Sequence, residues 1–211
     1  MKKAILFDLD GTLWDSSEVV SRVWTKTIRA NGLPDFLLTA KGIQAQMGKT
    51  MKAIGESLLP QLDPKERKRV LDLSCQAENE AVAAEGGVLY PQLEDTLQAL
   101  FPLYTLAIVS NCQNGYIEAF LHAHGLAKYF SDIQSGGNDC SKGHNIRLVI
   151  ERNGIDRAVY IGDTARDEAA AKEAGVPFFH ASYGFGTASE PAGVLTCIAE
   201  LPNMVSSFFP E

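Results

Sequence analysis

Short apolar runs that predict strands alternate with helical patterns over much of the chain. The apolar run at residues 4–7 opens a strand over residues 4–9, and continuous runs of this kind are typical of strands buried on both faces. Further strands are predicted over residues 103–109, 131–135, 158–161 and 176–181. Helices are predicted between them over residues 115–127, 144–153 and 166–174, the last closed by Gly175. Strands that alternate with helices at this spacing predict βαβ units and a parallel sheet.

The stretch between the first strand and the others has a helical pattern without a strand signal. Its apolar residues recur at helical spacing in four segments, residues 19–28, 39–46, 49–59 and 64–84. Asp63 and Pro64 are suited to the N-cap and the first position of the last of these helices. We therefore expect a core domain of residues 1–14 and 86–211 with an inserted helical domain of residues 15–85, and hinges at the two crossings.

Composition and charge limit the classes of protein to which the chain can belong. Its 211 residues can form one large domain or a core with an insert, and its net charge of −7 argues against nucleic acid or an anionic membrane as the main partner. The four cysteines are widely spaced, which predicts neither a zinc site nor a disulfide framework. The N-terminal apolar run is too short for a signal peptide, and no stretch is long enough to span a membrane. We expect a cytoplasmic protein that is a monomer or a weak homodimer.

Two aspartates, Asp8 and Asp10, stand at the end of the first predicted strand. Like charges this close, at the end of a buried strand, are costly to ionise unless a cation or a shared proton offsets them. The arrangement therefore predicts a divalent metal. It also offers one carboxylate as a nucleophile and the other as a proton carrier.

Other polar residues follow the later strands of the predicted sheet. Ser110 and Asn111 follow the second strand along the chain, and Lys142 lies in the loop beyond the third. Asp163 follows the fourth strand, and Asp167 comes one helical turn later. Ligands of open α/β sheets bind outside the carboxyl ends of the strands, so we expect these residues to face one crevice.

The carboxylates in this set suit a hard cation. Asp8, Asp163 and, through a water, Asp167 match the preference of Mg²⁺ for a few oxygen ligands, and the carbonyl of Asp10 could supply another. Asp167 has a simpler interpretation as an acidic residue in the first turn of a helix, where the helix dipole stabilises it. Residues 183–186, which are rich in glycine, either rim the same crevice or only form a turn.

The remaining groups suit the oxygens of a phosphoryl group. They are the hydroxyl of Ser110, the backbone N–H groups of Asn111 and Leu9, and the ammonium of Lys142. Lys142 would also offset the charge of Asp8 and keep it available as a nucleophile. The pattern therefore predicts a phosphate site that faces a carboxylate nucleophile.

These motifs resemble the haloacid dehalogenase superfamily, in the branch with a helical cap after the first motif. The resemblance rests on the pentad of residues 8–12, the Ser110-Asn111 pair and residues 162–167, and it covers nearly the whole chain. It implies a Rossmann-like three-layer α/β core with a parallel sheet and an inserted all-helical cap domain. One position departs from the pattern, because Gly143 follows the motif lysine where many capped members have a proline.

The resemblance also implies roles for individual residues. The first aspartate of the family's pentad, here Asp8, is phosphorylated, and the second, here Asp10, protonates the leaving group and then activates water. The dehalogenase members lack the second aspartate, so Asp10 favours phosphoryl transfer. Thr12 is a further substrate-binding candidate. Capped members often lower a cap loop onto the leaving group, which makes Lys49 a candidate specificity residue, although an ordinary surface lysine is the simpler interpretation.

The expected function is that of a Mg²⁺-dependent phosphatase acting on a small phosphorylated metabolite, with phosphoglycolate phosphatases as the nearest likeness. A phosphomutase of the β-phosphoglucomutase type is the alternative enzyme, and it would need more cationic groups in the cap to hold a bisphosphate. A non-catalytic binding module is the alternative from another class. Such a module should have lost at least one of the costly strand-end charges, and none is missing from the sequence.

Overall fold

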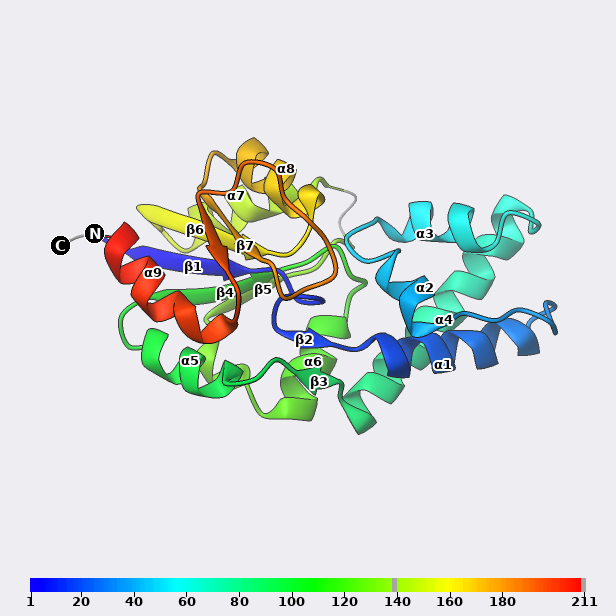
Figure 1. Cartoon of the computed structure of the whole chain (residues 1–211). Coiled ribbons are helices and arrows are strands. Elements are labelled where there is room, and N and C mark those ends of the chain that lie inside the picture. Colours follow the sequence, from blue (N-terminus) through cyan, green and yellow to red (C-terminus); the bar gives the residue numbers. More distant parts are fainter. Residues whose placement is uncertain (138–139, 210–211) are drawn as a thin grey trace.

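The computed structural model describes residues 1–137 and 140–209, and its centre is a six-stranded sheet (Figure 1). The strands stand in the order β5-β4-β1-β6-β7-β8, and every neighbouring pair is parallel. Their bounds are β1 (Lys3–Phe7), β4 (Thr105–Val109), β5 (Asp132–Gln134), β6 (Arg157–Gly162), β7 (Phe178–Ala181) and β8 (Gly193–Leu195). The parallel sheet predicted from the alternation of strands and helices is confirmed.

Helices cover both faces of this sheet and complete a three-layer core (Figure 1). One face carries α7 (Lys142–Arg152) and α8 (Ala165–Ala174). The other carries α5 (Leu93–Leu100), α6 (Tyr116–His124) and α9 (Leu201–Phe208). Two 3-10 turns, Ala127–Tyr129 and Ile198–Glu200, complete this layer.

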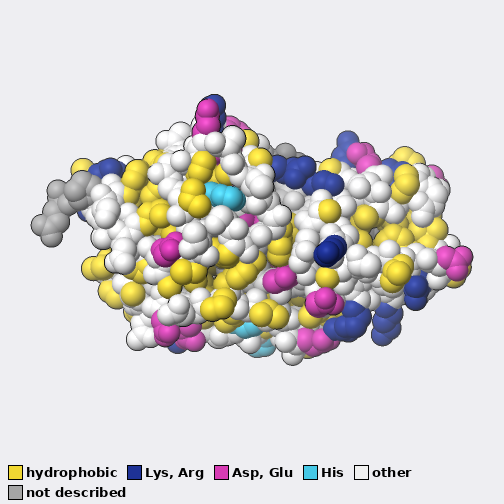
Figure 2. Space-filling view, viewed as in Figure 1, with side chains coloured by type: hydrophobic (Ala, Val, Ile, Leu, Met, Phe, Trp, Pro, Cys, Tyr) yellow, Lys and Arg dark blue, Asp and Glu magenta, His cyan; other side chains and the backbone are white. Residues whose placement is uncertain are grey.

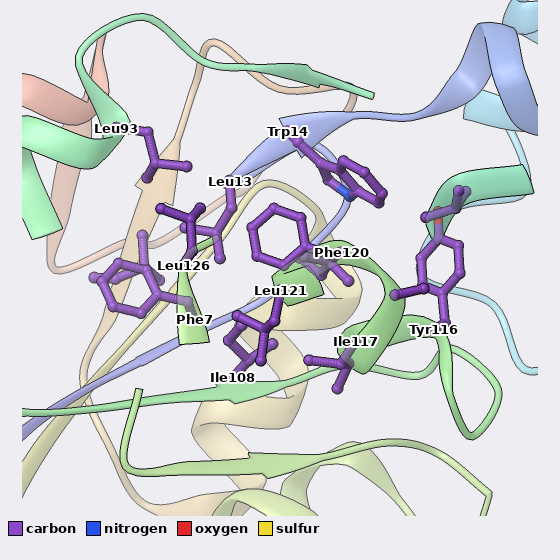
Figure 3. Close-up of a cluster of buried hydrophobic side chains, with 14 of the residues drawn as sticks. Phe7, Leu13, Trp14, Leu93, Ile108, Tyr116, Ile117, Phe120, Leu121 and Leu126 are labelled. Atoms are coloured by element: carbon purple, nitrogen blue, oxygen red, sulfur yellow. The ribbon is translucent and has the colours of Figure 1, made fainter. Parts of the chain in front are cut away.

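Alternate residues of β1 face opposite layers of the core. Phe7 packs with Phe120 of α6 in the larger hydrophobic cluster (Figure 3), whereas Leu6 packs with Ile146 of α7 in the smaller one. All four side chains are fully buried. Burial on both faces is the reason why this strand is a continuous apolar run in the sequence.

The helical segment inserted after β1 lies beyond the carboxyl ends of the strands (Figure 1). It consists of α1 (Ser17–Ala30), α2 (Ala40–Gln44), α3 (Met51–Leu58) and α4 (Pro64–Glu85). Asp63 caps α4 by accepting hydrogen bonds from two backbone N–H groups, and Pro64 is its first residue, as the sequence predicts. The long helices α1 and α4 pack against each other and form the frame of the insert.

A short antiparallel ribbon joins the two chain crossings between the insert and the core. It pairs β2 (Trp14–Asp15) with β3 (Val88–Leu89). Two-residue strands have no recognisable period, so the sequence pattern did not predict them. The pattern also missed β8, a strand of three residues, and the short helices α5 and α9, which have no side-chain N-cap.

Several predicted helix boundaries are wrong by two or three residues, among them the end of α2, the start of α3, the end of α6 and the start of α7. α6 ends at His124, because Gly125 adopts a left-handed conformation, and not at residue 127. α7 begins at Lys142, which the sequence placed in a loop. Ser141 caps this helix by accepting a hydrogen bond from the N–H of His144, so the helix starts before the apolar pattern does.

The surface of the insert is charged. Most Lys and Arg side chains visible in Figure 2 lie over the helical segment, and acidic side chains lie among them. Over the described ranges, 1–137 and 140–209, no helix is both long and apolar enough to cross a membrane.

Candidate active site

The carboxyl ends of three neighbouring strands bring the predicted polar residues together. Asp8 follows β1, Ser110 follows β4 and Asp163 follows β6. These strands are adjacent in the sheet and parallel, so their ends form one edge. Lys142 and Asp167 reach the same edge from the first turns of α7 and α8. All five side chains are buried.

The ammonium of Lys142 lies between two carboxylates. Its Nζ atom is 2.7 Å from Asp8 Oδ1 and 2.5 Å from Asp167 Oδ1, and it lies 5.5 Å from the centre of the Tyr160 ring. Burial disfavours the charged lysine, but the two carboxylates outweigh this effect and raise the pKa of Lys142 well above its ordinary value. Lys142 therefore remains a cation and offsets part of the negative charge around it.

Asp8 experiences more negative charge than Lys142 can offset. Burial and the nearby Asp167 raise the pKa of Asp8 to about 7, while Lys142 and the backbone N–H of Leu9 act in the opposite direction. An additional cation beside Asp8 would favour its ionised form. The ionised form is the one that can act as a nucleophile.

Asp163 has an unsatisfied oxygen that points to a missing positive group. Its Oδ2 atom accepts a hydrogen bond from the N–H of Phe185 at 2.7 Å. Its Oδ1 atom is buried and has no hydrogen-bond partner within residues 1–137 and 140–209. Burial, together with the charges of Asp167 and Asp8, raises the pKa of Asp163 to about 8.

Asp8, Asp163 and Asp167 each place a carboxylate oxygen within 4.8 Å of the others. This donor set consists of hard oxygens and carries more negative charge than the single ammonium of Lys142 balances. Both properties fit a divalent cation such as Mg²⁺. The described residues therefore suit the metal that the sequence predicts.

The position of Asp167 fits both interpretations that the sequence left open, an acidic residue in the first turn of a helix and a partner of the metal site. Its Oδ2 accepts hydrogen bonds from the N–H and the hydroxyl of Thr164, and its own N–H donates to that hydroxyl, so the two residues form a capping box at the start of α8. Its Oδ1 faces Lys142 and belongs to the carboxylate cluster. Because protein donors already contact both oxygens, the geometry suits contact with a metal through water better than direct ligation.

Asp10 turns away from the carboxylate cluster. Its Oδ1 accepts hydrogen bonds from the indole of Trp14 at 3.0 Å, the hydroxyl of Ser16 at 2.8 Å and the phenol of Tyr116 at 3.0 Å. Burial raises the pKa of Asp10 to about 6, although these three donors lower it. A carboxyl group with such a pKa can both give and take a proton near neutral pH.

The residues predicted to bind a phosphoryl group differ in whether their polar groups already have hydrogen-bond partners. The hydroxyl of Thr12 is buried without a hydrogen-bond partner among the residues that the structure describes. The N–H of Ser110 donates to the carbonyl of Gln134 at 3.0 Å, and its buried hydroxyl lies beside the thiol of Cys112. The side chain of Asn111 donates to the carbonyl of Gly48 at 3.0 Å and so contacts the insert.

A cavity of about 50 Å³ separates these core residues from the insert. Lys49 contributes to its wall, and its ammonium donates to Gln46 Oε1 at 2.8 Å. The core side of the wall includes Asp8, Asp10 and Ser110. The insert therefore closes over the strand ends.

Two turns, one at Gly11 and one at residues 183–186, hold the carboxylate of Asp163 in place. Gly11 has a φ of 79°, and a Cβ at this position would lie 2.2 Å from Asp163 Oδ2. Tyr183 donates its phenol to the carbonyl of Thr12 at 2.9 Å, two residues before the Phe185 N–H that holds Asp163. Residues 183–186 therefore do more than form a turn, because they support the site directly.

A steric constraint explains why Gly143 follows Lys142. A Cβ at Gly143 would lie 2.5 Å from the side chain of Glu173 on α8. Glu173 in turn accepts a hydrogen bond from Ser141, the residue that caps α7. This packing of α7 on α8 places Lys142 without a proline at the next position.

Tyr116 and Glu78 are polar residues of this site that were not identified from the sequence, as are the Asp10 partners Trp14 and Ser16. Tyr116 is the first residue of α6, and nothing in its local pattern indicates a contact with Asp10. Glu78 lies on α4 and lines the cavity. A signal for it exists, because Leu71, Ser74 and Val82 are buried positions on the same helix at spacings of three and four residues. An acid within such a row indicates a polar contact.

Comparison with known proteins identifies the family. The model of the family described as haloacid dehalogenase-like hydrolase matches residues 5–181. The chain is 30% identical to a phosphoglycolate phosphatase of Vibrio vulnificus over 96% of each chain, and 32% identical to one of Shigella boydii over 87% of this chain and 82% of that protein.

Solved structures share the fold along almost the whole chain. A structure described as a predicted phosphoglycolate phosphatase from Haemophilus somnus has a TM-score of 0.83 at 21% identity, over 97% of this chain and 98% of that chain. A haloacid dehalogenase-like family protein from Streptococcus pneumoniae has a TM-score of 0.82 at 23% identity, with the same coverage of both chains. Because the family model spans most of the sequence and the relatives align along nearly their full lengths, the chain belongs to the haloacid dehalogenase-like hydrolases.

Proposed function

We propose that this phosphatase hydrolyses a small phosphomonoester in the presence of Mg²⁺, through a phosphorylated Asp8. The observation that carries the proposal is the difference between the surroundings of Asp8 and Asp10. Asp8 faces Lys142 and the carboxylate cluster, whereas Asp10 is held by three uncharged donors outside that cluster. Two carboxyl groups in such different surroundings are suited to separate roles as nucleophile and as acid and base.

The proposed reaction has two displacement steps at phosphorus. In the first, an oxygen of Asp8 forms a bond to phosphorus while the bond to the leaving alcohol breaks, and Asp10 gives its proton to the leaving oxygen. In the second, Asp10 takes a proton from water as the water oxygen bonds to phosphorus. The bond from phosphorus to Asp8 then breaks, which releases phosphate and restores both carboxyl groups.

The other residues of the site bind and orient the phosphoryl group in this proposal. The ammonium of Lys142 and the hydroxyls of Ser110 and Thr12 supply donors for its oxygens. The backbone N–H of Asn111 supplies another donor.

Carboxylates of Asp8 and Asp163, the carbonyl of Asp10 and, through water, Asp167 would hold the Mg²⁺ ion. When bound, the ion offsets the negative charge that keeps the nucleophile and the phosphoryl group apart.

We also propose that residues 15–85 form a cap domain that opens and closes over the site. The cavity of about 50 Å³ between the insert and the strand ends is narrow, so we expect the cap to open when substrate enters. Opening would break the contact between Asn111 and Gly48. Closure would exclude bulk water during the first step and so protect the phosphorylated intermediate.

The cavity favours hydrolysis over a phosphomutase reaction. A bisphosphate would place a second phosphoryl group against the insert, where it needs several cations. Among the described residues of the insert that line the cavity, Lys49 is the single cation, and it already contacts Gln46. The relatives named phosphoglycolate phosphatases make phosphoglycolate the first substrate to test.

Phosphate release over a panel of phosphomonoesters tests the proposal. The panel should include phosphoglycolate, sugar phosphates, nucleotides and an aryl phosphate, assayed with Mg²⁺. We expect release from at least one ester by the native chain and none by the Asp8→Asn variant. Folded protein that releases phosphate from none of them would contradict the proposed function.

A further inference from the structure

Glu78 is a buried acid on the part of the insert that faces the reacting groups. Its side chain lies on α4 and is 6% exposed, and its Oε2 accepts a hydrogen bond from the indole of Trp24 on α1 at 2.7 Å. It shares the wall of the closed cavity with Asp8 and Asp10. A group of the substrate that extends from phosphorus toward the insert therefore approaches Glu78.

The position of Asp10 indicates which group of the substrate extends toward Glu78. The leaving oxygen must face Asp10, because Asp10 supplies its proton in the proposed reaction. Asp10 turns away from the carboxylate cluster toward Tyr116, and both residues line the same cavity as Glu78. The leaving alcohol is thus directed to the side of the cavity where Glu78 lies.

The remaining wall offers little support for a second anion on that side. Most insert residues around Glu78 are apolar: Val20, Trp24, Ile43, Met47, Met51 and Ile54. The polar exceptions are Gln46 and Lys49, which contact each other, and Lys49 also borders an open hollow beside Asn111 and Arg166, away from α4. A carboxylate or phosphate on the leaving group would therefore lie in largely apolar surroundings without a free cation among the described residues, which is costly.

The contacts of Glu78 prepare it to accept hydrogen bonds. Trp24 donates its indole N–H to Glu78 Oε2, and the nearby side chain of Gln113 also favours the ionised form of Glu78. Burial nevertheless raises the pKa of Glu78 to about 8, so that without a ligand the group is mostly protonated near neutral pH. A donor from a ligand, above all a cationic one, would lower this pKa and make Glu78 a charge-assisted acceptor, whereas an anion would raise it further.

We infer that Glu78 selects phosphoesters whose leaving alcohol carries a hydroxyl or an ammonium group, and rejects those that carry a second anionic group. The inference rests on the phosphatase function proposed above. It makes Glu78 a specificity-determining residue with no part in the bond-breaking steps. It also separates this chain from the activity in the names of its phosphoglycolate phosphatase relatives.

Three phosphoesters of nearly equal size test the inference. They are 2-hydroxyethyl phosphate, 2-aminoethyl phosphate and phosphoglycolate, which differ in a neutral, a cationic and an anionic end group. We expect kcat/KM for at least one of the first two to exceed that for phosphoglycolate about tenfold or more, the effect of one hydrogen bond to a charged group. The hydroxyl and ammonium esters show which donor Glu78 prefers.

The Glu78→Gln variant tests whether the side chain of Glu78 causes this order of kcat/KM values. We expect it to reduce the ratio of kcat/KM values for the preferred ester and phosphoglycolate by about tenfold. The ratio is measured within one enzyme, so a smaller folded fraction does not change it. Glu80→Gln, which removes an exposed acid from the same helix, should leave the ratio unchanged.

Binding provides a readout that needs no turnover. In the Asp8→Asn variant, calorimetry should show the same order of Kd values for the three esters. Phosphoglycolate as the best of the three substrates, or an unchanged ratio in Glu78→Gln, would overturn the inference while leaving the phosphatase function intact. Hydrolysis of no ester in the wider panel would overturn the proposed function and this inference with it.

Discussion

Tyr116 Oη lies 3.0 Å from Asp10 Oδ1 and donates a hydrogen bond that connects the first residue of α6 to the aspartate two positions after Asp8. The same phenol lies 2.8 Å from the hydroxyl of Ser16, which also contacts Asp10. This network stabilises the ionised form of Asp10 in a buried position. Substitution of these donors should therefore shift the pKa of Asp10, the proposed proton carrier.

The Tyr116→Phe variant should shift the pH profile. Losing a donor to the carboxylate raises the pKa of Asp10 above its present value of about 6. Cleavage of the ester requires protonated Asp10, so the alkaline limb of kcat/KM should move up by about one pH unit. The profile is measured with one ester across pH 5 to 9. A limb that stays in place would remove Asp10 as the acid.

The Asp8→Asn variant should be inactive and folded. An amide cannot form the bond to phosphorus, so we expect kcat to fall by about a thousandfold or more. The fold should persist, because the substitution removes one of the like charges that burial and Asp167 make costly. Phosphate release and thermal unfolding measure the two effects. Activity above a trace would exclude Asp8 as the nucleophile.

Stability without metal should fall as the pH rises. The pKa values of Asp8 and Asp163 are about 7 and about 8 in the fold, against an ordinary value of 3.8. Between pH 4 and 8 the folded state therefore binds more protons than the unfolded chain, and the free energy of unfolding decreases with pH. We expect the Tm in chelator to fall over this range.

Added Mg²⁺ should reverse this loss of stability. Binding to the folded state at about one hundred times Kd contributes about 2.7 kcal/mol, so Tm at pH 8 should rise and phosphate release should return. Asp163→Asn is the matched variant, and it should flatten the pH dependence in chelator and weaken the response to metal. Equal responses of native and variant protein would show that the cluster binds no metal.

The Lys142→Gln variant should lose stability in a pH-dependent way. Removing one partner of a buried ion pair costs about 3 to 5 kcal/mol, since the buried carboxylates of Asp8 and Asp167 lose the ammonium that faces both of them. The loss should be largest near pH 8 and smaller near pH 5, where Asp8 is protonated more readily. Denaturant unfolding at the two pH values measures it, and equal losses would contradict this role.

The core of the fold and the ends of its strands were predictable because both follow from short-range patterns. The continuous apolar run before Asp8 indicates a strand buried on both faces, and parallel strands place their carboxyl ends together. Asp8, Ser110 and Asp163 therefore meet even though about fifty residues or more separate them in the chain. Their roles in catalysis stay predictions until the variants are measured.

The partners of Asp10 and the position of Glu78 could not be predicted in the same way. The contact between Asp10 and Tyr116 joins residues 106 positions apart and depends on the turn of α6 that faces the cavity. The direction of the Glu78 side chain depends on the rotation of α4 about its own axis. The spacing of buried residues along α4 does not tell whether this acid contacts Trp24 or solvent. The start of α7 at Lys142 depended on Ser141 as a cap, which the apolar period did not reveal.

Trp14 belongs to two parts of the molecule at once. It is one of the two residues of β2, in the ribbon that joins the insert to the core, and its indole donates to Asp10. It also packs against Tyr116, a second donor to the same carboxylate. We therefore expect a rotation of the ribbon to alter the pKa of Asp10, which would couple movement of the proposed cap to the proton affinity of the proposed acid through one indole ring.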